Sequence, residues 1–398
     1  MNPAKIDVYC VAIVVISITF GACTDDVELP EEIHNIHNLT IYPKDADPIS
    51  NITLIQEQIF GDTNEILIGN ITDLAIDEKA RVYVADDQRG KIHVFDSNDD
   101  YMKSIGEKGR GPEEFQDIAQ ITYFENHLYA YDYLQRNIHI YSLDSLKLNR
   151  VIPLSSEKWN RIANLKHSFP IAFYLKDKNT FLMEFAEIAP PGKTDGKTYN
   201  RLYIMNNKGV IVSDLIIKKK SPAYLISNSG NLLSPPFIRS SLMAISDRGN
   251  IYHAWSEDFL IKVYNEHGRY LRAFYYPYNK SKLIKKEVLE LYDDQPLLYQ
   301  AYSKIVFPST WPALNTMVMD DKNRLWISTI TDNEKEYSWW VLDKSGELLA
   351  KFDWPGNRMK RSIHSPPLGV IKNGYYYERQ IDKKKGAQII VKYRIRMD

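Results

Sequence analysis

The chain has 398 residues, with 50 Lys and Arg against 51 Asp and Glu, and a formal net charge of −1. Hydrophobic residues make up 44% and charged residues 25%, which excludes disordered, collagen-like and coiled-coil chains. The near-zero charge lacks the basic excess that neutralises phosphates, so nucleic acid is not expected as a partner. The 27 tyrosines favour a strand-rich structure.

The N-terminal residues 1–22 have the pattern of a secretion signal. Val8–Phe20 is almost entirely apolar, but it is shorter than the roughly 20 residues that span a bilayer. The segment Phe20-Gly21-Ala22-Cys23 resembles a bacterial lipobox, although lipoboxes usually have an aliphatic residue where Phe20 stands. The resemblance implies cleavage before Cys23 and lipidation of its thiol. An uncleaved N-terminal anchor helix is the alternative.

Residues 23–50 are predicted to form a flexible tether. The segment Thr24–Glu28 is acidic and resembles the signal that sends Bacteroides-type lipoproteins to the outer cell surface. Three prolines follow, at positions 30, 43 and 48, as is common in linkers. We therefore expect an outer-membrane lipoprotein held to the membrane by its lipid, at the cell surface or on the periplasmic side.

A hairpin pattern repeats from about residue 70. Each copy has an apolar strand, a short turn rich in Asp, Asn, Lys and Gly, and a second strand that usually carries an aromatic residue. Clear copies are Leu74–Val84, Met243–Tyr252 and Val318–Ile327, and weaker ones are Ile121–Ala130, Phe173–Met183 and Gly369–Tyr377.

A third strand follows in every copy and a fourth in five of them, the latter including Val210–Ile217, Tyr270–Tyr276 and Glu347–Trp354. Six units of four antiparallel strands predict an all-β, six-bladed β-propeller over residues 51–398. The last copy ends after its third strand, and Ile52–Phe60 is the only unassigned strand candidate. We expect this N-terminal strand to complete the last blade and close the ring.

The six units, together with the glycine-rich segment Ile105–Phe115, resemble NHL-related propellers. More narrowly, they resemble the six-bladed propeller lipoproteins of Bacteroides-type bacteria, most of which have no characterised function. The glycine-rich segment does not end in the Gly-Lys-Ser/Thr of a phosphate loop, so we interpret it as a tight crossing between blades.

The long insertions of a propeller of this topology emerge on one face. Here they are residues 155–168, 186–200, 218–239 and 277–313, and part of 282–302 has near-helical apolar spacing. This face is the predicted binding surface. The candidate ligand-contacting residues on it are Asp86, Arg89, Arg110, Asp132, Tyr133, Arg136, His253, Glu257 and Asp258.

Three classes of function are compatible with these residues, of which one is a scaffold that only positions other envelope proteins. The leading hypothesis is a non-catalytic, membrane-anchored module that binds a peptide, a glycan or a partner protein of the envelope, without a cofactor. The alternative is a hydrolase or lyase resembling the lactonase-like six-bladed enzymes, in which carboxylates, with His253 as a further candidate, hold a divalent cation in the central channel. Solvated loop charges or turn caps would explain the same carboxylates without a ligand.

Overall fold

The computed structural model describes Pro30 and residues 33–61, 66–187, 198–222, 225–226, 232–361, 369–382 and 385–398. The predicted signal segment 1–22 and Cys23 lie outside the described residues. The chain divides into two units, residues 1–36 and 37–398, and the fold described below is that of the second. Among the described residues, no helix is long and apolar enough to cross a membrane.

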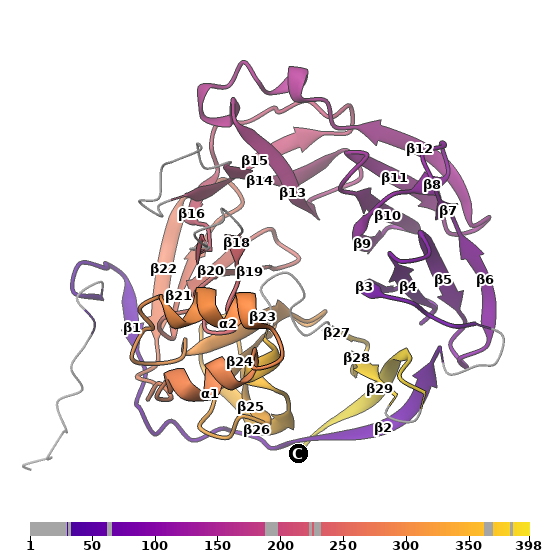
Figure 1. Cartoon of the computed structure of the whole chain (residues 1–398). Coiled ribbons are helices and arrows are strands. Elements are labelled where there is room, and N and C mark those ends of the chain that lie inside the picture. Colours follow the sequence, from indigo (N-terminus) through magenta and orange to yellow (C-terminus); the bar gives the residue numbers. More distant parts are fainter. Residues whose placement is uncertain are drawn as a thin grey trace, which may run out of the picture. The chain divides into compact units, whose positions relative to one another are not determined.

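Residues 37–398 form six four-stranded antiparallel blades around a centre (Figure 1). Blade 1 comprises β3 (Ile71–Ile76), β4 (Val82–Asp86), β5 (Lys91–Phe95) and β6 (Tyr101–Ile105). Blade 2 comprises β9 (Ile118–Phe124), β10 (His127–Asp132), β11 (Asn137–Ser142) and β12 (Lys147–Pro153). Blade 3 comprises β13 (Ser168–Leu175), β14 (Thr180–Glu187), β15 (Tyr199–Asn206) and β16 (Ile217–Lys220).

The second half of the ring follows the same plan. Blade 4 comprises β19 (Ser241–Ile245), β20 (Ile251–Trp255), β21 (Leu260–Tyr264) and β22 (Tyr270–Tyr275). Blade 5 comprises β23 (Leu314–Met319), β24 (Leu325–Ile330), β25 (Glu336–Leu342) and β26 (Leu348–Pro355). Blade 6 comprises β27 (Gly369–Lys372), β28 (Tyr375–Ile381), β29 (Gln388–Met397) and the N-terminal β2 (Ile52–Phe60). The six-bladed fold predicted from the repeats is therefore confirmed.

The predicted ring closure is also confirmed. β2 pairs antiparallel with β29, from Ile52 opposite Met397 to Phe60 opposite Ile390. The Phe60 ring lies 6.0 Å from the Phe95 ring of blade 1 and 6.4 Å from the Tyr377 ring of blade 6. The N-terminal strand thus completes one sheet and packs against the next, which removes an open sheet edge.

Apolar side chains fill each of the six contacts between neighbouring blades. Large aromatic residues dominate between blades 5 and 6, where Trp326, Trp339 and Tyr376 are buried. The contact between blades 3 and 4 is the smallest among the described residues, with Leu182, Leu202, Ile217 and Ile251 buried. Among the described residues, the core therefore includes one apolar cluster at each of the six contacts between sheets.

Two strand predictions are wrong. Residues 23–50 were expected to be a tether throughout, but β1 (Leu39–Ile41) pairs in parallel with β22 as a fifth strand of blade 4. The Tyr42 ring then stacks on the Tyr276 ring at 4.7 Å. The outer strand of a blade has unpaired backbone groups, and β1 satisfies those of β22. In blade 3 the fourth strand is β16 (Ile217–Lys220) and not residues 210–217, because residues 206–216 form a longer turn region.

Connections between blades contain the remaining elements. The glycine-rich crossing holds β7 (Glu107–Lys108) and β8 (Glu114–Phe115), and residues 221–240 hold β17 (Leu225–Ile226) and β18 (Leu232–Leu233). Two helices, α1 (Lys285–Glu290) and α2 (Pro296–Ser303), lie between blades 4 and 5, where helical spacing was predicted. Short 3₁₀ turns are Ser156–Lys158, Ala163–Leu165 and Arg358–Lys360.

Candidate functional site

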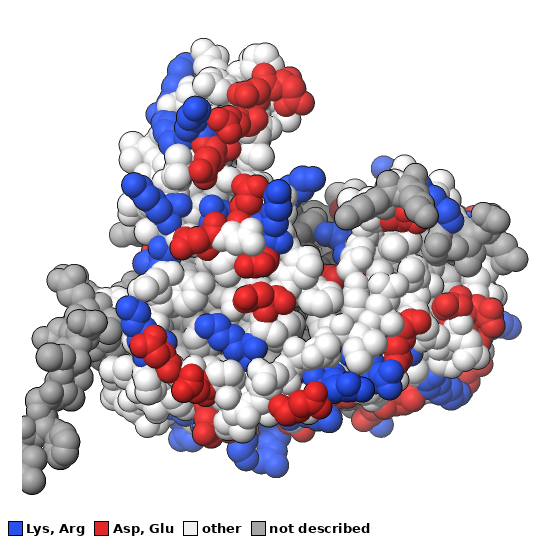
Figure 2. All heavy atoms as spheres, turned by 90° about the horizontal axis from the view of Figure 1, so that it is seen from below, with Lys and Arg blue, Asp and Glu red and all other residues white. Residues whose placement is uncertain are grey.

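The loops of the propeller emerge on two faces. We call the side with the connections between blades and the loops between second and third strands the insertion face, and the opposite side the turn face. Residues 277–313, with α1 and α2, lie on the insertion face, and Figure 2 shows them standing out from the ring with acidic and basic side chains mixed over them.

The carboxylates of Asp86 and Asp132 occupy matching positions at the ends of β4 and β10, and both are fully buried. Asp86 accepts hydrogen bonds from the backbone N–H groups of Gly69 (2.8 Å) and Asn70 (3.0 Å), and Asp132 accepts one from Gln116 (2.6 Å). Each carboxylate therefore ties its own blade to the preceding connection. The prediction that Asp86 and Asp132 contact a ligand is wrong, because neither reaches the surface.

Arg89, Arg110, Tyr133 and Arg136 lie on the insertion face over blades 1 and 2. The Arg89 guanidinium is 3.9 Å from Asp86, whereas Arg110 and Arg136 are exposed and have no side-chain partner among the described residues. Gln135, next to Arg136, donates to the carbonyls of Gly109 (3.2 Å) and Glu114 (2.9 Å). The loops that carry Arg110 and Arg136 are therefore in contact, and both guanidinium groups stay unpaired among the described residues.

Tyr133 differs from these arginines because its ring is half-buried. It makes edge contacts with the rings of Phe169, at 5.9 Å, and Tyr131, at 6.4 Å. Burial raises the pKa of its hydroxyl, and the nearby Asp117 carboxylate adds to this effect.

The glycine-rich segment is a crossing between blades 1 and 2, as interpreted. A Cβ at Gly90, which has φ +62°, would lie 2.7 Å from the Cα of Lys108, so the crossing packs directly on the loop of blade 1. Phe115 at its end is fully buried between the two blades. The segment therefore has a packing role that explains its glycines without a phosphate.

Glu257 and Asp258 form an ion-pair network with two cations. The Arg239 guanidinium donates to Glu257 at 2.5 Å, and Lys280 lies 2.7 Å from Glu257 and 3.1 Å from Asp258. Burial raises the pKa of Glu257, but the hydrogen bonds from Arg239 and Lys280 outweigh it and keep the pKa below the ordinary value. These carboxylates therefore anchor the start of residues 277–313, and the structure does not leave them free for a ligand.

His253 lies on β20, near the contact between blades 3 and 4. Its Nε2 is 3.2 Å from the Ser241 hydroxyl, and burial, together with Lys219, Lys262 and Lys220, lowers its pKa to about 3. One of these lysines, Lys219, pairs with the Glu184 carboxylate at 2.9 Å. The expectation that His253 helps to hold a cation is wrong, because lysines surround it.

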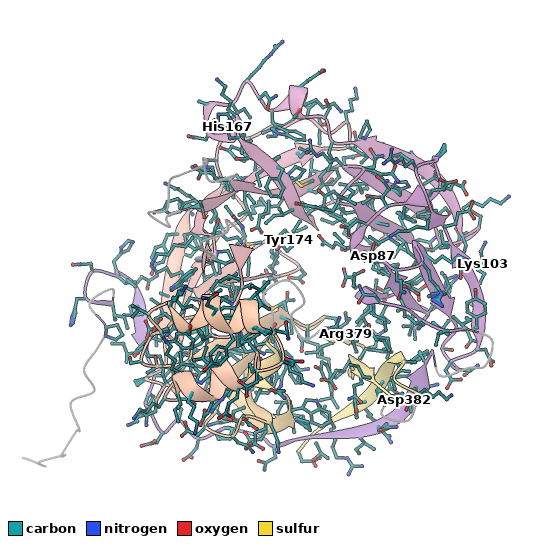
Figure 3. All side chains as sticks on the ribbon, in the orientation of Figure 1. Asp87, Lys103, His167, Tyr174, Arg379 and Asp382 are labelled. Carbon is teal, nitrogen blue, oxygen red and sulfur yellow. The ribbon has the colours of Figure 1, made fainter. Side chains whose placement is uncertain are left out.

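The innermost strands line the centre of the ring. Figure 3 shows Asp87, Tyr174 and Arg379 around the central opening, on blades 1, 3 and 6. In the part of the chain that the structure describes, no three His, Cys, Asp or Glu side chains are grouped so that they could hold a metal ion. The carboxylate cluster that the enzyme alternative requires is therefore not present among these residues.

One channel residue was missed by the sequence reasoning. The Asp73 carboxylate on β3 accepts from the backbone N–H of Ile121 on β9, at 2.8 Å, and burial raises its pKa to about 7. Gln120 makes the matching connection from β9 to the backbone of Phe173 on β13. An acidic residue within the otherwise apolar strand Ile-Thr-Asp-Leu-Ala-Ile was the available signal. Both side chains hold neighbouring blades together.

Residues 277–313 combine a buried base with an exposed apolar end. Leu283, Val288 and Trp311 are buried against the cluster between blades 5 and 6, and Lys285 donates to the carbonyls of Ser303 (2.7 Å) and Ile305 (3.0 Å). In contrast, Leu297 is 84% exposed and Val306 is 94% exposed. Ile284 and Tyr299 are exposed as well. The insertion is thus fixed to the ring and offers apolar side chains to solvent.

The comparisons with known proteins concern the whole ring. Residues 60–266, just over half of the chain, match the DUF5128 family, which is described as a 6-bladed beta-propeller. A candidate exported protein from Bacteroides fragilis has a TM-score of 0.50 and 13% identity, over 90% of this chain and 99% of its own. A member of the DUF4221 family from Bacteroides vulgatus has a TM-score of 0.51 and 10% identity, over 88% and 99%. No curated protein matches the sequence.

Proposed function

Because the chain belongs to the DUF5128 family of six-bladed β-propellers, we propose that it is a lipid-anchored binding module of the cell envelope whose insertion face docks a partner protein. The lipobox-like segment before Cys23 supports the anchor. The candidate exported protein from Bacteroides fragilis, which shares the fold, is consistent with a location outside the cytoplasm. The proposed location is the outer membrane, at the cell surface.

The observation that carries this proposal is the exposure of apolar side chains on a fixed insertion. Leu297 and Val306 are the two most exposed large hydrophobic residues among those described. Leu67 and Leu134 on loops of the same face, and Ile381 at the end of β28, are also exposed. An exposed apolar patch rimmed by polar residues is typical of a protein interaction site.

The chemistry of the insertion face favours a protein over a sugar as the occupant here. Apolar side chains gain from burial against an apolar groove, and exposed Arg110 and Arg136 can pair with carboxylates at its rim. No bound cofactor is needed for such contacts. The non-catalytic proposal therefore uses only side chains that the structure leaves exposed.

The experiment is site-specific photo-crosslinking of the full chain in its own membrane. A photoreactive residue at position 306 should give a discrete adduct with one envelope protein, and the same residue at Val212, an exposed apolar position outside the insertion face, should not. Adding Leu297→Asp should abolish the adduct. This substitution should change stability by only about 0.5 kcal/mol or less, because the side chain lies in solvent.

Two results would contradict the proposal. One is the absence of any adduct at position 306, and the other is the same adduct at positions 306 and 212. A further measurement addresses the enzyme alternative, since a stoichiometric divalent metal in the protein purified without chelator would favour a metal-dependent site at the channel.

A further inference from the structure

A cavity of about 340 Å³ opens on the turn face between blades 2 and 3. It is remote from the insertion face and independent of the function proposed above. Blade 2 supplies its floor and one wall, and the turns of blade 3 supply the other wall. The lining residues are Glu125, His127, Tyr129, Ile140, Asn149, Arg150, Lys178, Asn179 and Asn207.

The floor of the cavity holds a buried tyrosine with an unused hydroxyl. Tyr129 is 3% exposed and Ile140 is 2% exposed. No group in the described residues forms a hydrogen bond with the Tyr129 hydroxyl, whereas the buried Tyr131 hydroxyl donates to Pro170 at 2.8 Å. The Tyr129 hydroxyl is therefore available to a molecule that enters the cavity.

The walls carry cations that the protein does not neutralise. Arg150 on β12 and Lys178 in the turn after β13 form no ion pair or hydrogen bond within the described part of the chain. The nearby Asp177 carboxylate is already occupied by the Thr180 hydroxyl, at 2.6 Å, and by the backbone N–H of Asn179. The cavity thus presents two cations with unused hydrogen-bond donors, beside the charged carboxylates of Glu125 and Asp177, of which Asp177 already accepts hydrogen bonds from the protein.

The remaining polar lining residues are His127 and three asparagines, and several of them are held by hydrogen bonds. The Asn207 amide donates to Asn179 at 2.8 Å, and one ring nitrogen of His127 lies 2.9 Å from the Glu125 carbonyl. The Asn179 and Asn207 amides still have unused hydrogen-bond donors and acceptors. The Asn149 amide forms no hydrogen bond with the described residues, so all of its donors and acceptors can serve a ligand. Amides and hydroxyls that both donate and accept match the hydroxyl groups of a sugar ring.

We infer that this cavity binds a sugar unit that carries a carboxylate. The two free cations account for the carboxylate, the amides and the Tyr129 hydroxyl account for the sugar hydroxyls, and the aromatic floor supports the ring. The volume lies at the small end of the roughly 300–1,000 Å³ of ligand pockets. This size fits a short or terminal sugar unit.

Galacturonate is the probe, and binding to the purified full chain is measured by titration calorimetry. We expect saturable binding at millimolar concentration, with binding of galactose at least about tenfold weaker because it lacks the ion pair. Tyr129→Phe removes one hydroxyl only and should weaken galacturonate binding about tenfold. Arg150→Gln should remove the preference for galacturonate over galactose.

Arg248→Gln is the matched control, since Arg248 is an exposed turn-face arginine of blade 4. It should bind galacturonate as the unchanged protein does. No saturation by galacturonate would overturn the inference, and so would unchanged binding by both cavity variants. Equal binding of acetate would show a simple anion site and would also overturn it. Leu297 lies on the other face, so the effect of Leu297→Asp on crosslinking tests the proposed docking function independently of galacturonate binding.

Discussion

At the scale of single residues, one aspartate organises a whole turn in blade 1. Asp77 is buried and accepts from the backbone N–H groups of Lys79 and Arg81, from the Arg81 guanidinium at 2.6 Å and from the Tyr83 hydroxyl at 3.0 Å. Asp320 does the same in blade 5 with Arg324 and the Trp326 indole. In blades 1 and 5, the aromatic residue that recurs in the sequence repeat is thus a hydrogen-bond partner of the turn.

Replacing Asp77 by Ala should therefore destabilise the ring. The change leaves the Arg81 guanidinium buried without its carboxylate, which costs about 3–5 kcal/mol. Urea unfolding followed by fluorescence would measure the loss. Asp247→Ala is the control, because Asp247 is exposed in the equivalent turn of blade 4, where Ser246 stands in the place of Asp77. Equal losses in both variants would contradict this role.

The buried His139 side chain leads to a second prediction at this scale, which concerns the pH dependence of the free energy of unfolding. It is buried on β11, neither ring nitrogen has a hydrogen-bond partner among the described groups, and burial lowers its pKa below the ordinary 6.5. Below pH 6.5 the His139 side chain takes up a proton in the unfolded chain, whereas in the folded chain it stays neutral down to its lower pKa. The free energy of unfolding should therefore fall as the pH drops from 6.5 towards the pKa of the folded state.

His139→Phe should reduce this dependence, since it keeps a ring of similar size and removes the titration. We expect a flatter plot of unfolding free energy between pH 7 and pH 5, measured by urea unfolding. His267→Gln on the exposed turn of blade 4 serves as control. An unchanged slope in the Phe variant would show that His139 does not contribute.

At the scale of elements, the closure of the ring depends on β2. This strand is remote in sequence from β29, and Phe60 at its end packs against aromatic rings of blades 1 and 6. Phe60→Ala should cost about 3–5 kcal/mol through the lost contacts and the cavity left behind. Relative to the unchanged protein, hydrogen exchange should accelerate more in β2 and β29 than in β14, because the closing strand pair loses the packing of the Phe60 ring.

The matched control for the closing strand is Ile49→Ala, which truncates an exposed side chain just before β2. It should leave both the unfolding free energy and the exchange rates nearly unchanged. Uniformly faster exchange in all six blades of the Phe60 variant would mean that the ring unfolds as one unit and that the closure has no separate stability.

Sequence patterns were more informative about inner strands than about outer ones. The second strands of blades 1, 2 and 5 carry mostly apolar or aromatic residues because both of their faces are covered by neighbouring blades. Outer strands such as β16, with the sequence Ile-Lys-Lys-Lys, have no such pattern. This explains the misplaced fourth strand of blade 3 and the overlooked pairing of β1.

At the scale of the whole molecule, the proposed lipid anchoring places the acyl chains on Cys23. Cys23→Ala should move the protein from the detergent phase to the aqueous phase in a phase-separation assay. Burial of acyl chains contributes about 0.8 kcal/mol per CH₂ group, and the substitution removes the thiol that is proposed to carry them. Cys10→Ala is the control, since Cys10 lies within the apolar signal segment. Retention of the Cys23 variant in the detergent phase would favour an uncleaved anchor helix.

The amino-acid sequence by itself determined the six repeats, the four strands of most blades and the strand that closes the ring. These features depend on the local alternation of apolar residues and on turn residues, and both patterns can be recognised in the sequence. The last repeat contains only three strands, so its fourth strand had to come from another part of the chain. The glycine-rich crossing could be interpreted for the same reason, because its glycines are a local requirement of the backbone.

Only the tertiary structure decided which polar residues are free. Asp86 and Asp132 are acidic loop residues in the sequence, yet backbone N–H groups of the preceding connection bury them. Glu257 is neutralised by Arg239 and by Lys280, which lies in the next connection. Conversely, Tyr129 and Arg150 meet Lys178 of another blade around a cavity. Whether a charge is paired, buried or free depends on residues distant in sequence, and only folding brings those together.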